Sequence, residues 1–139
     1  MTAAAFVAQA RSYLGVPWVH QGRTRDGIDC LGLVVESARV SHGSTVDVRD
    51  YAAQAQDETM LQLCQQHMDR VWPAQMQVGD IAVIRYANQR HMAIITDYPA
   101  PGEFGLLHAS SIYGQVVEHR LDAAWRRMIL AAFRLRGGV

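Results

Sequence analysis

Two cysteines and six histidines are the side chains of this 139-residue sequence best suited to catalysis. All thirteen basic side chains are arginines, so the sequence contains no lysine. Schiff-base chemistry, a Ser–Lys dyad and a phosphate-binding P-loop all need the lysine amine, and we exclude them. The sequence also has no GxSxG, GxGxxG or Walker pattern, which argues against a serine hydrolase, a dinucleotide-binding enzyme and an NTPase.

Cys30 has the sequence context expected of a nucleophile. It follows Asp29, a good helix N-cap, and opens an apolar run that predicts a helix over residues 30–42. Because the N-terminus of a helix stabilises an anion, we expect a lowered pKa for this thiol. Gly32 is expected to leave room for a substrate backbone near the sulfur. The alternative is that Cys30 is a small buried hydrophobic residue, the usual role of a free cysteine in an apolar segment.

Cys64, in contrast, is expected to be inert packing. It lies in the middle of a helix predicted over residues 57–71, on the same face as Leu61 and Met68. Two cysteines are too few for a disulfide framework, and they do not form a CxxC pair. The N-terminal residues lack the features of a secretory signal, so we expect synthesis in the cytoplasm and no disulfide.

A nucleophilic cysteine needs a general base, and His91 and His108 are the best-placed candidates. His91 opens a predicted strand over 91–97, and His108 lies within a predicted strand over 104–110. If these strands are neighbours, the two histidines form a cross-strand pair in which one is the base and the other fixes its tautomer. The alternative is that each histidine simply caps the end of a strand.

The other four histidines are expected at surface or structural positions: His20, His42, His67 and His119. His20 lies in the glycine-rich loop before Cys30, so it is a candidate for lining a cleft. No HExxH or CxxC zinc pattern exists, and we expect no metal and no cofactor, although a site made of His91, His108 and His119 stays open. Arg23 and Arg25 form either a solvated turn or a charge that attracts an anionic substrate.

The expected elements place helices first and strands after them. Helices are predicted over 2–14, 30–42 and 57–71, with a strand as the alternative for 30–42 because of its β-branched residues. Strands are predicted over 80–86, 91–97, 104–110, 115–120 and 128–135, with residues 87–90 closing a hairpin between the first two. This order predicts a single α+β domain over 1–139, with N-terminal helices packed on one side of an antiparallel sheet of about five strands.

Charge and hydropathy exclude two classes of partner. Thirteen acidic residues balance the thirteen arginines, and this zero net charge argues against a nucleic-acid-binding protein. No segment approaches the ~18 uninterrupted apolar residues of a membrane span, so we expect no membrane insertion.

Four segments together resemble the NlpC/P60 cysteine peptidases: LGVPWVHQGRTRDGIDCLGLV, VGDIAVI, RHMAIITD and LLHASS. Their order and spacing agree with that family from about Ser12 to Phe133. The wording HQGRxRxGIDCxGL further resembles the branch found in phage tail assembly and gene-transfer particles.

The resemblance implies a papain-like α+β core that cleaves peptide bonds in bacterial cell-wall stem peptides, commonly between D-glutamate and a diamino acid. Cys30 then matches the nucleophile, His91 the general base and His108 the third, orienting residue. Asp29 matches a residue that contacts the free amine of a short stem peptide, and the Cys30 backbone N–H would contribute to the oxyanion hole.

Two positions depart from the family pattern. Trp18 stands where many members carry tyrosine, and Leu31 where many carry serine, both near the substrate. Losing a hydroxyl at each position removes hydrogen bonds that would hold a peptide terminus, which alters the expected specificity.

We therefore expect a cysteine endopeptidase for peptidoglycan peptides that acts at the cell wall as part of a phage tail or tail-like particle, with tail proteins as further partners. A non-catalytic tail or wall-binding module with the same fold is the main alternative. A thioester-forming acyltransferase is a third.

Overall fold

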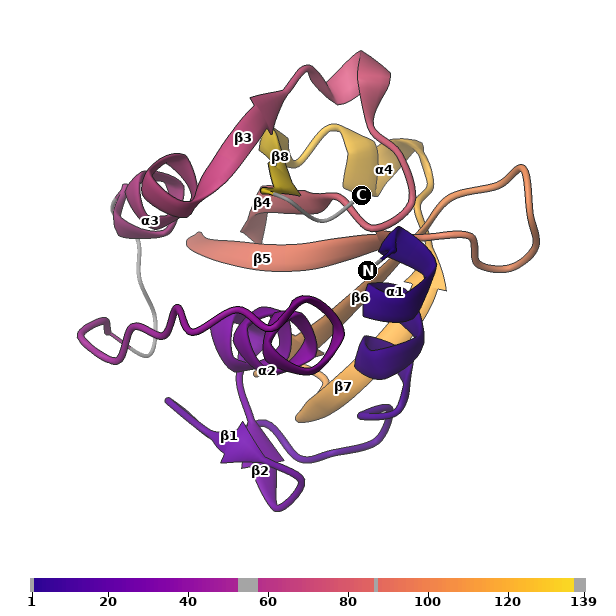
Figure 1. Cartoon of the computed structure of the whole chain (residues 1–139). Coiled ribbons are helices and arrows are strands. Elements are labelled where there is room, and N and C mark those ends of the chain that lie inside the picture. The colour runs from indigo at the N-terminus through magenta and orange to yellow at the C-terminus, as the bar shows by residue number, and fades with distance from the viewer. Residues whose placement is uncertain (1, 53–57, 87, 137–139) are drawn as a thin grey trace.

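A computed structural model describes residues 2–52, 58–86 and 88–136 of the chain (Figure 1). The N-terminal half is mainly helical, and its elements are α1 (Ala3–Arg11), β1 (Arg23–Thr24), β2 (Gly27–Ile28), α2 (Cys30–His42) and α3 (Thr59–His67). The C-terminal half is mainly β, and its elements are β3 (Met68–Val71), η1 (Pro73–Gln75), β4 (Ile81–Tyr86), β5 (Gln89–Thr96), β6 (Gly105–Ser110), β7 (Gln115–Arg120), α4 (Ala123–Arg126) and β8 (Ile129–Leu135).

A six-stranded antiparallel sheet forms the centre of the fold, with the strand order β3-β8-β4-β5-β6-β7. The predicted α+β class and antiparallel sheet are confirmed, with one strand more than expected. In the predicted hairpin, Tyr86 pairs directly with Gln89, so the turn is tighter than the expected 87–90 connection; Ala87 lies outside the described residues.

The helix that carries Cys30 has the predicted bounds, because both of its ends are capped. The Asp29 side chain accepts a hydrogen bond from the Gly32 backbone N–H at its start, and Gly43 closes it in the left-handed conformation (φ 67°). The strand alternative for this segment is therefore wrong. Helix α1 is capped by Thr2 as expected but ends at Arg11, three residues before the predicted Leu14.

The helix predicted over 57–71 is wrong in its last four residues. Met68–Val71 form the strand β3, which pairs with β8 from Met68↔Leu135 to Val71↔Ala132. In this stretch the buried Met68 is followed by exposed Asp69 and Arg70, and the open edge of β8 supplies hydrogen-bond partners that a helix end would lack. The predicted start at Asp57 lies outside the described residues.

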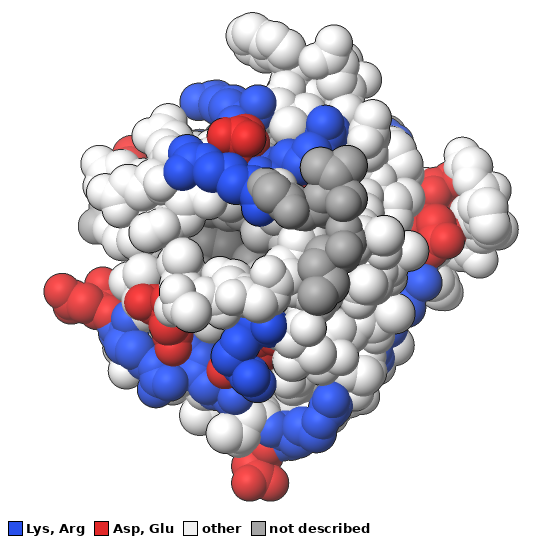
Figure 2. All heavy atoms as spheres, in the orientation of Figure 1, with Lys and Arg blue, Asp and Glu red and all other residues white. Residues whose placement is uncertain are grey.

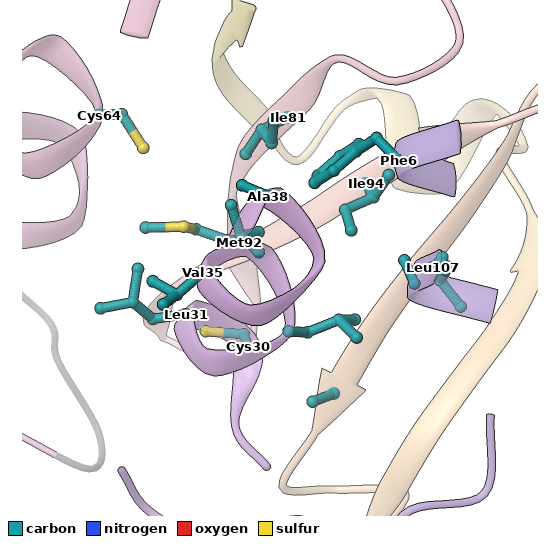
Figure 3. Packing of buried hydrophobic residues seen from close by; sticks show 14 of the residues in the cluster. Phe6, Cys30, Leu31, Val35, Ala38, Cys64, Ile81, Met92, Ile94 and Leu107 are labelled. Carbon is teal, nitrogen blue, oxygen red and sulfur yellow. The ribbon is translucent and has the colours of Figure 1, made fainter. Parts of the chain in front are cut away.

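The core fills both faces of the sheet. Helices α1, α2 and α3 cover one face, where Phe6, Val35 and Cys64 pack in one cluster with strand residues such as Ile94 and Leu107 (Figure 3). The opposite face holds a smaller cluster around Ala93, Ile95 and Leu106, against which Trp125 of α4 packs. The expectation of helices on one side is thus incomplete, because the short helix α4 covers part of the second face.

Cys64 takes its expected place in this core. It is 1% exposed and lies between α3 and α2, close to Leu31 and Met92 (Figure 3). Burial, followed by the charge of the neighbouring Cys30, raises the pKa of the Cys64 thiol to about 12. Both cysteines are free thiols. Among the described residues, no helix is both long enough and apolar enough to cross a bilayer.

Gly32 has a different role from the predicted one. A Cβ at this position would lie 2.3 Å from the Gly22 carbonyl oxygen and 2.9 Å from Cγ1 of Ile28. The space beside the first turn of α2 is therefore filled by the loop that precedes Cys30, and it is not open to a substrate. Glycine is required here because it lets that loop lie directly on the helix.

Candidate active site

Cys30 is the first residue of α2 and lies in a pocket shared with His91. The thiol residue is 8% exposed, and so is His91. The pocket has a volume of about 350 Å³, which includes solvent space at its open mouth. Its walls come from the loop before α2, the segment after α2, helix α3, the start of β5 and the residue after β6: Trp18, Asp29, Cys30, Tyr51, Ala52, Met60, Gln89, Arg90, His91 and Ser111. The fold thus brings the predicted nucleophile and base to one concave site.

His91 is hydrogen-bonded to His108 as predicted for a cross-strand pair. Nε2 of His91 lies 2.7 Å from Nδ1 of His108, and the ring centroids are 4.8 Å apart. The two residues come from β5 and β6, which pair from Ile94↔Leu107 to Thr96↔Gly105. His91 makes no other hydrogen bond within the part of the chain that the structure describes, so its Nδ1 is left for the pocket.

His119 extends this pair into a row of three imidazoles. Its Nε2 lies 2.8 Å from Nε2 of His108, and its Nδ1 lies 3.1 Å from the Arg120 carbonyl oxygen. Of the two positions expected for His119, surface or structural, the structure favours the structural one: His119 is half-buried and lies diagonally across the β6–β7 ladder from His108, which pairs with Val117.

The three histidines do not form a metal centre. Their ring nitrogens bond to one another in a line, so their lone pairs do not converge on one point. Among the described residues, no group of three or more His, Cys, Asp or Glu side chains has a geometry that fits a metal ion.

Burial keeps the inner histidines neutral. Desolvation lowers the pKa of His91 to about 4. It also lowers the pKa of His108 well below its usual value, and the charges of His91 and His119 act in the same direction. Both rings are therefore uncharged at neutral pH.

The pKa of Cys30 is raised, opposite to the prediction from its helix position. Burial and then the charge of Asp29 raise it to about 12, while backbone hydrogen bonds from Met92, Leu31 and Cys30 itself act in the other direction. Desolvation and a neighbouring carboxylate thus outweigh the helix N-terminus. At rest the pocket therefore holds a neutral thiol and a neutral imidazole.

Asp29 is already saturated with hydrogen bonds. Its Oδ1 accepts from Gly32 N (2.8 Å) and Arg23 Nη1 (3.1 Å), and its Oδ2 accepts from Gln21 N (2.7 Å) and the Tyr51 hydroxyl (2.6 Å). Asp29 lines the pocket as predicted, but its carboxylate is shared by four donors of the protein. A contact between Asp29 and a substrate amine stays a prediction.

Arg23 does not present a free charge to the pocket. It is 8% exposed, pairs with both Asp29 and Asp47, and donates to the Val48 carbonyl (2.8 Å). Its charge is thus neutralised inside the protein, which corrects the expectation that it attracts an anionic substrate. On the face shown in Figure 2, arginines likewise lie close to acidic side chains.

The remaining predicted residues lie at different places. Trp18 lines the pocket, but Leu31 is turned toward the core between α2 and α3 (Figure 3). His20 packs edge-on against Tyr51, with ring centroids 5.5 Å apart, and its buried Nδ1 has no hydrogen-bond partner within the described part of the chain. Arg25 lies elsewhere, with its guanidinium 4.2 Å from the Tyr13 ring centroid.

Sequence reasoning missed Tyr51 and Arg90, and it named His119 only as a possible metal ligand. Tyr51 lies in an irregular segment whose path no local pattern predicts. Arg90 directly precedes His91, so its position at the pocket could have been inferred once His91 was predicted as the base. The short connection from Ser110 to Gln115 fixes the register of β6 and β7, and that register would have placed His119 beside His108.

Comparisons with known proteins agree with this architecture. A model described as the NlpC/P60 family matches residues 15–134. The chain is similar to the NlpC/p60 domain of the peptidoglycan hydrolase SagA, at 21% identity and a TM-score of 0.64, over 97% of this chain and 100% of that one. At such identities the likeness shows the fold.

Two further solved structures are longer than this chain. The peptidoglycan hydrolase RipB from Mycobacterium tuberculosis is 19% identical with a TM-score of 0.65, over 95% of this chain and 63% of RipB. A lipoprotein-like NLP/P60 family protein from Staphylococcus aureus is 20% identical with a TM-score of 0.66, over 96% of this chain and 41% of that protein. No curated protein sequence gives a significant match.

The raised pKa of Cys30 predicts a thiol that reacts slowly at rest. In a Cys64→Ala variant, we expect alkylation by iodoacetamide to accelerate about tenfold per pH unit through pH 9, because the thiolate fraction rises tenfold per unit below the pKa. Intact-mass spectrometry measures the rate, with glutathione as the reference thiol. An alkylation rate that levels off at or below pH 8 would contradict the assignment.

Proposed function

The chain belongs to the NlpC/P60 family, and we propose that it is a cysteine endopeptidase that hydrolyses amide bonds in peptidoglycan stem peptides through an acyl-enzyme at Cys30. One observation carries this proposal: Cys30 shares a pocket with His91, whose Nε2 is hydrogen-bonded to His108 and whose Nδ1 has no hydrogen bond among the described residues. Two proteins of similar fold, SagA and RipB, are described as peptidoglycan hydrolases.

The proposed reaction follows from the neutral state of the pair. Sγ of Cys30 attacks the peptide carbonyl carbon while Nδ1 of His91 takes the thiol proton, so no thiolate is needed beforehand. The oxyanion forms near the Cys30 backbone N–H at the start of α2. Collapse of the tetrahedral intermediate breaks the C–N bond, and His91 returns the proton to the leaving amine. Water then hydrolyses the thioester, with His91 again as the base.

For the scissile bond, we propose the bond between D-glutamate and a diamino acid, which the family resemblance supports. The wall of the pocket differs from the usual family pattern at Trp18, which adds an apolar ring beside Cys30. The other departure, Leu31, is turned toward the core, so its missing hydroxyl affects packing more than the pocket.

We place the activity at the cell wall, in a phage tail or tail-like particle with tail proteins as partners. The support is the resemblance of residues 20–33 to the tail-associated branch of the family.

A second candidate function is a non-catalytic module of a tail or a wall-binding protein with the same fold. The raised pKa of Cys30 favours it, because a buried neutral thiol is also what a purely structural cysteine would show. The hydrogen bond between the pocket residue His91 and the buried His108 favours the enzyme.

The two functions differ in their response to one substitution. We expect wild type to release fragments from purified peptidoglycan and Cys30→Ala to lose at least about 10³-fold of that rate, because the nucleophile is gone. Chromatography of the released muropeptides with mass detection measures it, and Cys64→Ala is the matched control that retains activity. Equal release by Cys30→Ala, or release only with added metal, would contradict the proposal. Binding to the wall without release would favour the second function.

Arg90 is the cationic residue that lines the pocket next to His91. Its Nη2 pairs with Glu58 at 3.2 Å, while its Nε is buried without a hydrogen-bond partner among the described residues. A buried unpaired donor is costly, and a carboxylate is the acceptor that a guanidinium binds best. We therefore propose that Arg90 binds a carboxylate of the stem peptide, such as the free carboxylate of glutamate.

An Arg90→Gln variant tests this contact. A hydrogen bond to a charged group is worth roughly 1.5–3 kcal/mol, so kcat/KM for the acidic peptide should fall about 10- to 100-fold, mainly through KM. The control is Arg85→Gln, an exposed position opposite Arg90 on β4. Steady-state kinetics with an acidic peptide and its amidated analogue measure the effect. If wild type cleaves the amidated peptide equally well, the carboxylate contact does not exist.

A further inference from the structure

The row of three imidazoles ends at a group whose hydrogen-bonding role is fixed. Nδ1 of His119 lies 3.1 Å from the carbonyl oxygen of Arg120, at the outer end of the row. We propose that His119 is a positioning residue that, by donating to this carbonyl, sets the tautomers of His108 and His91 and leaves His91 Nδ1 unprotonated. The inference rests on the proposed function only in that this nitrogen is the base for Cys30.

The Arg120 carbonyl fixes the hydrogen position on the outermost ring, His119. A carbonyl oxygen only accepts hydrogen bonds, so Nδ1 of His119 carries the hydrogen. A neutral imidazole has one N–H, and Nε2 of His119 is then an acceptor. The Nε2–Nε2 contact of 2.8 Å therefore needs a hydrogen on His108 Nε2.

The hydrogen position on His119 determines those on His108 and His91. With its hydrogen on Nε2, neutral His108 has an accepting Nδ1, which lies 2.7 Å from His91 Nε2. That contact places the hydrogen of His91 on Nε2. Nδ1 of His91 is left with a lone pair, in the ring that lines the pocket with Cys30. A thiol proton can be accepted only in this arrangement.

The neutral state of the two inner rings supports this outcome. His108 is fully buried and its pKa, like that of His91, is lowered, so both rings stay neutral. In a row of three neutral rings, all N–H groups can point either outward or inward along the row. With all of them pointing inward, the lone pair of His119 Nδ1 would face the lone pairs of the Arg120 carbonyl oxygen. Trp125 holds the outer ring, with its centroid 4.5 Å from that of His119 and 5.5 Å from that of His108.

The groups that face the row are few. Tyr86 of β4 lies beside His91 and His108, with ring centroids 5.6 and 6.1 Å away. Tyr113 lies 6.5 Å from His119. Among the described residues, no carboxylate is hydrogen-bonded to any of the three rings, so the Arg120 carbonyl is the acceptor that decides the polarity.

Nitrogen-15 NMR of the imidazole rings in the intact protein tests the assignment directly. At neutral pH, we expect His91 and His108 as Nε2–H tautomers and His119 as the Nδ1–H tautomer. The variant His119→Phe removes the acceptor for His108, so the His108 tautomer should shift toward Nδ1–H. In the same variant, kcat for peptidoglycan fragments should fall about tenfold or more, while KM stays within about twofold. His119→Gln, whose side-chain oxygen accepts from His108, should restore most of the rate. The exposed His67→Phe on α3 is the matched control and should match wild type.

Two results would overturn the inference. One is a wild-type His91 that carries its hydrogen on Nδ1. The other is a folded His119→Phe variant with unchanged tautomers and full kcat. If that variant does not fold, the wild-type spectrum still decides. Because the spectrum needs no turnover, a protein with the expected tautomers that hydrolyses no peptidoglycan would contradict the proposed function and leave the tautomer assignment standing.

Discussion

The carboxylate of Asp29 is the group on which the site depends. It caps α2 through Gly32, and it gathers three further donors from Arg23, Gln21 and Tyr51. These contacts join the start of the helix, the loop before it and the irregular segment after it. This buried carboxylate thus helps to fix where Cys30 lies and which walls surround it, because its four hydrogen bonds tie these segments to one group.

The same charge has a chemical consequence. Asp29 lies next to Cys30, and together with burial it keeps the thiol protonated at rest. In the proposed mechanism the helix start therefore positions Cys30 without lowering its pKa, and the thiol is activated by the base. We propose His91 for that role, as a neutral ring hydrogen-bonded to His108 that takes the thiol proton as the sulfur attacks.

Local signals explain which features were predictable from the sequence. The helix of Cys30 has a cap at each end, and the alternation around His91 and His108 places both on one face of neighbouring strands. The strand β3 was missed because its partner β8 lies more than fifty residues along the chain. The prediction of a lowered pKa for Cys30 was wrong because the sulfur is buried against β5, a strand about sixty residues away in sequence, and this burial cannot be recognised from the residues around Cys30.

The central claim is that Cys30 forms the covalent intermediate with His91 as its base, and trapping the acyl-enzyme tests it most directly. A stem-peptide ester that acylates faster than it deacylates is mixed with the protein, and the intact mass is measured after acid quenching. The account predicts an adduct of the acyl mass, mapped to Cys30, that forms in wild type and not in His91→Ala. Ester turnover without an adduct, or an adduct that forms equally fast in His91→Ala, would contradict it.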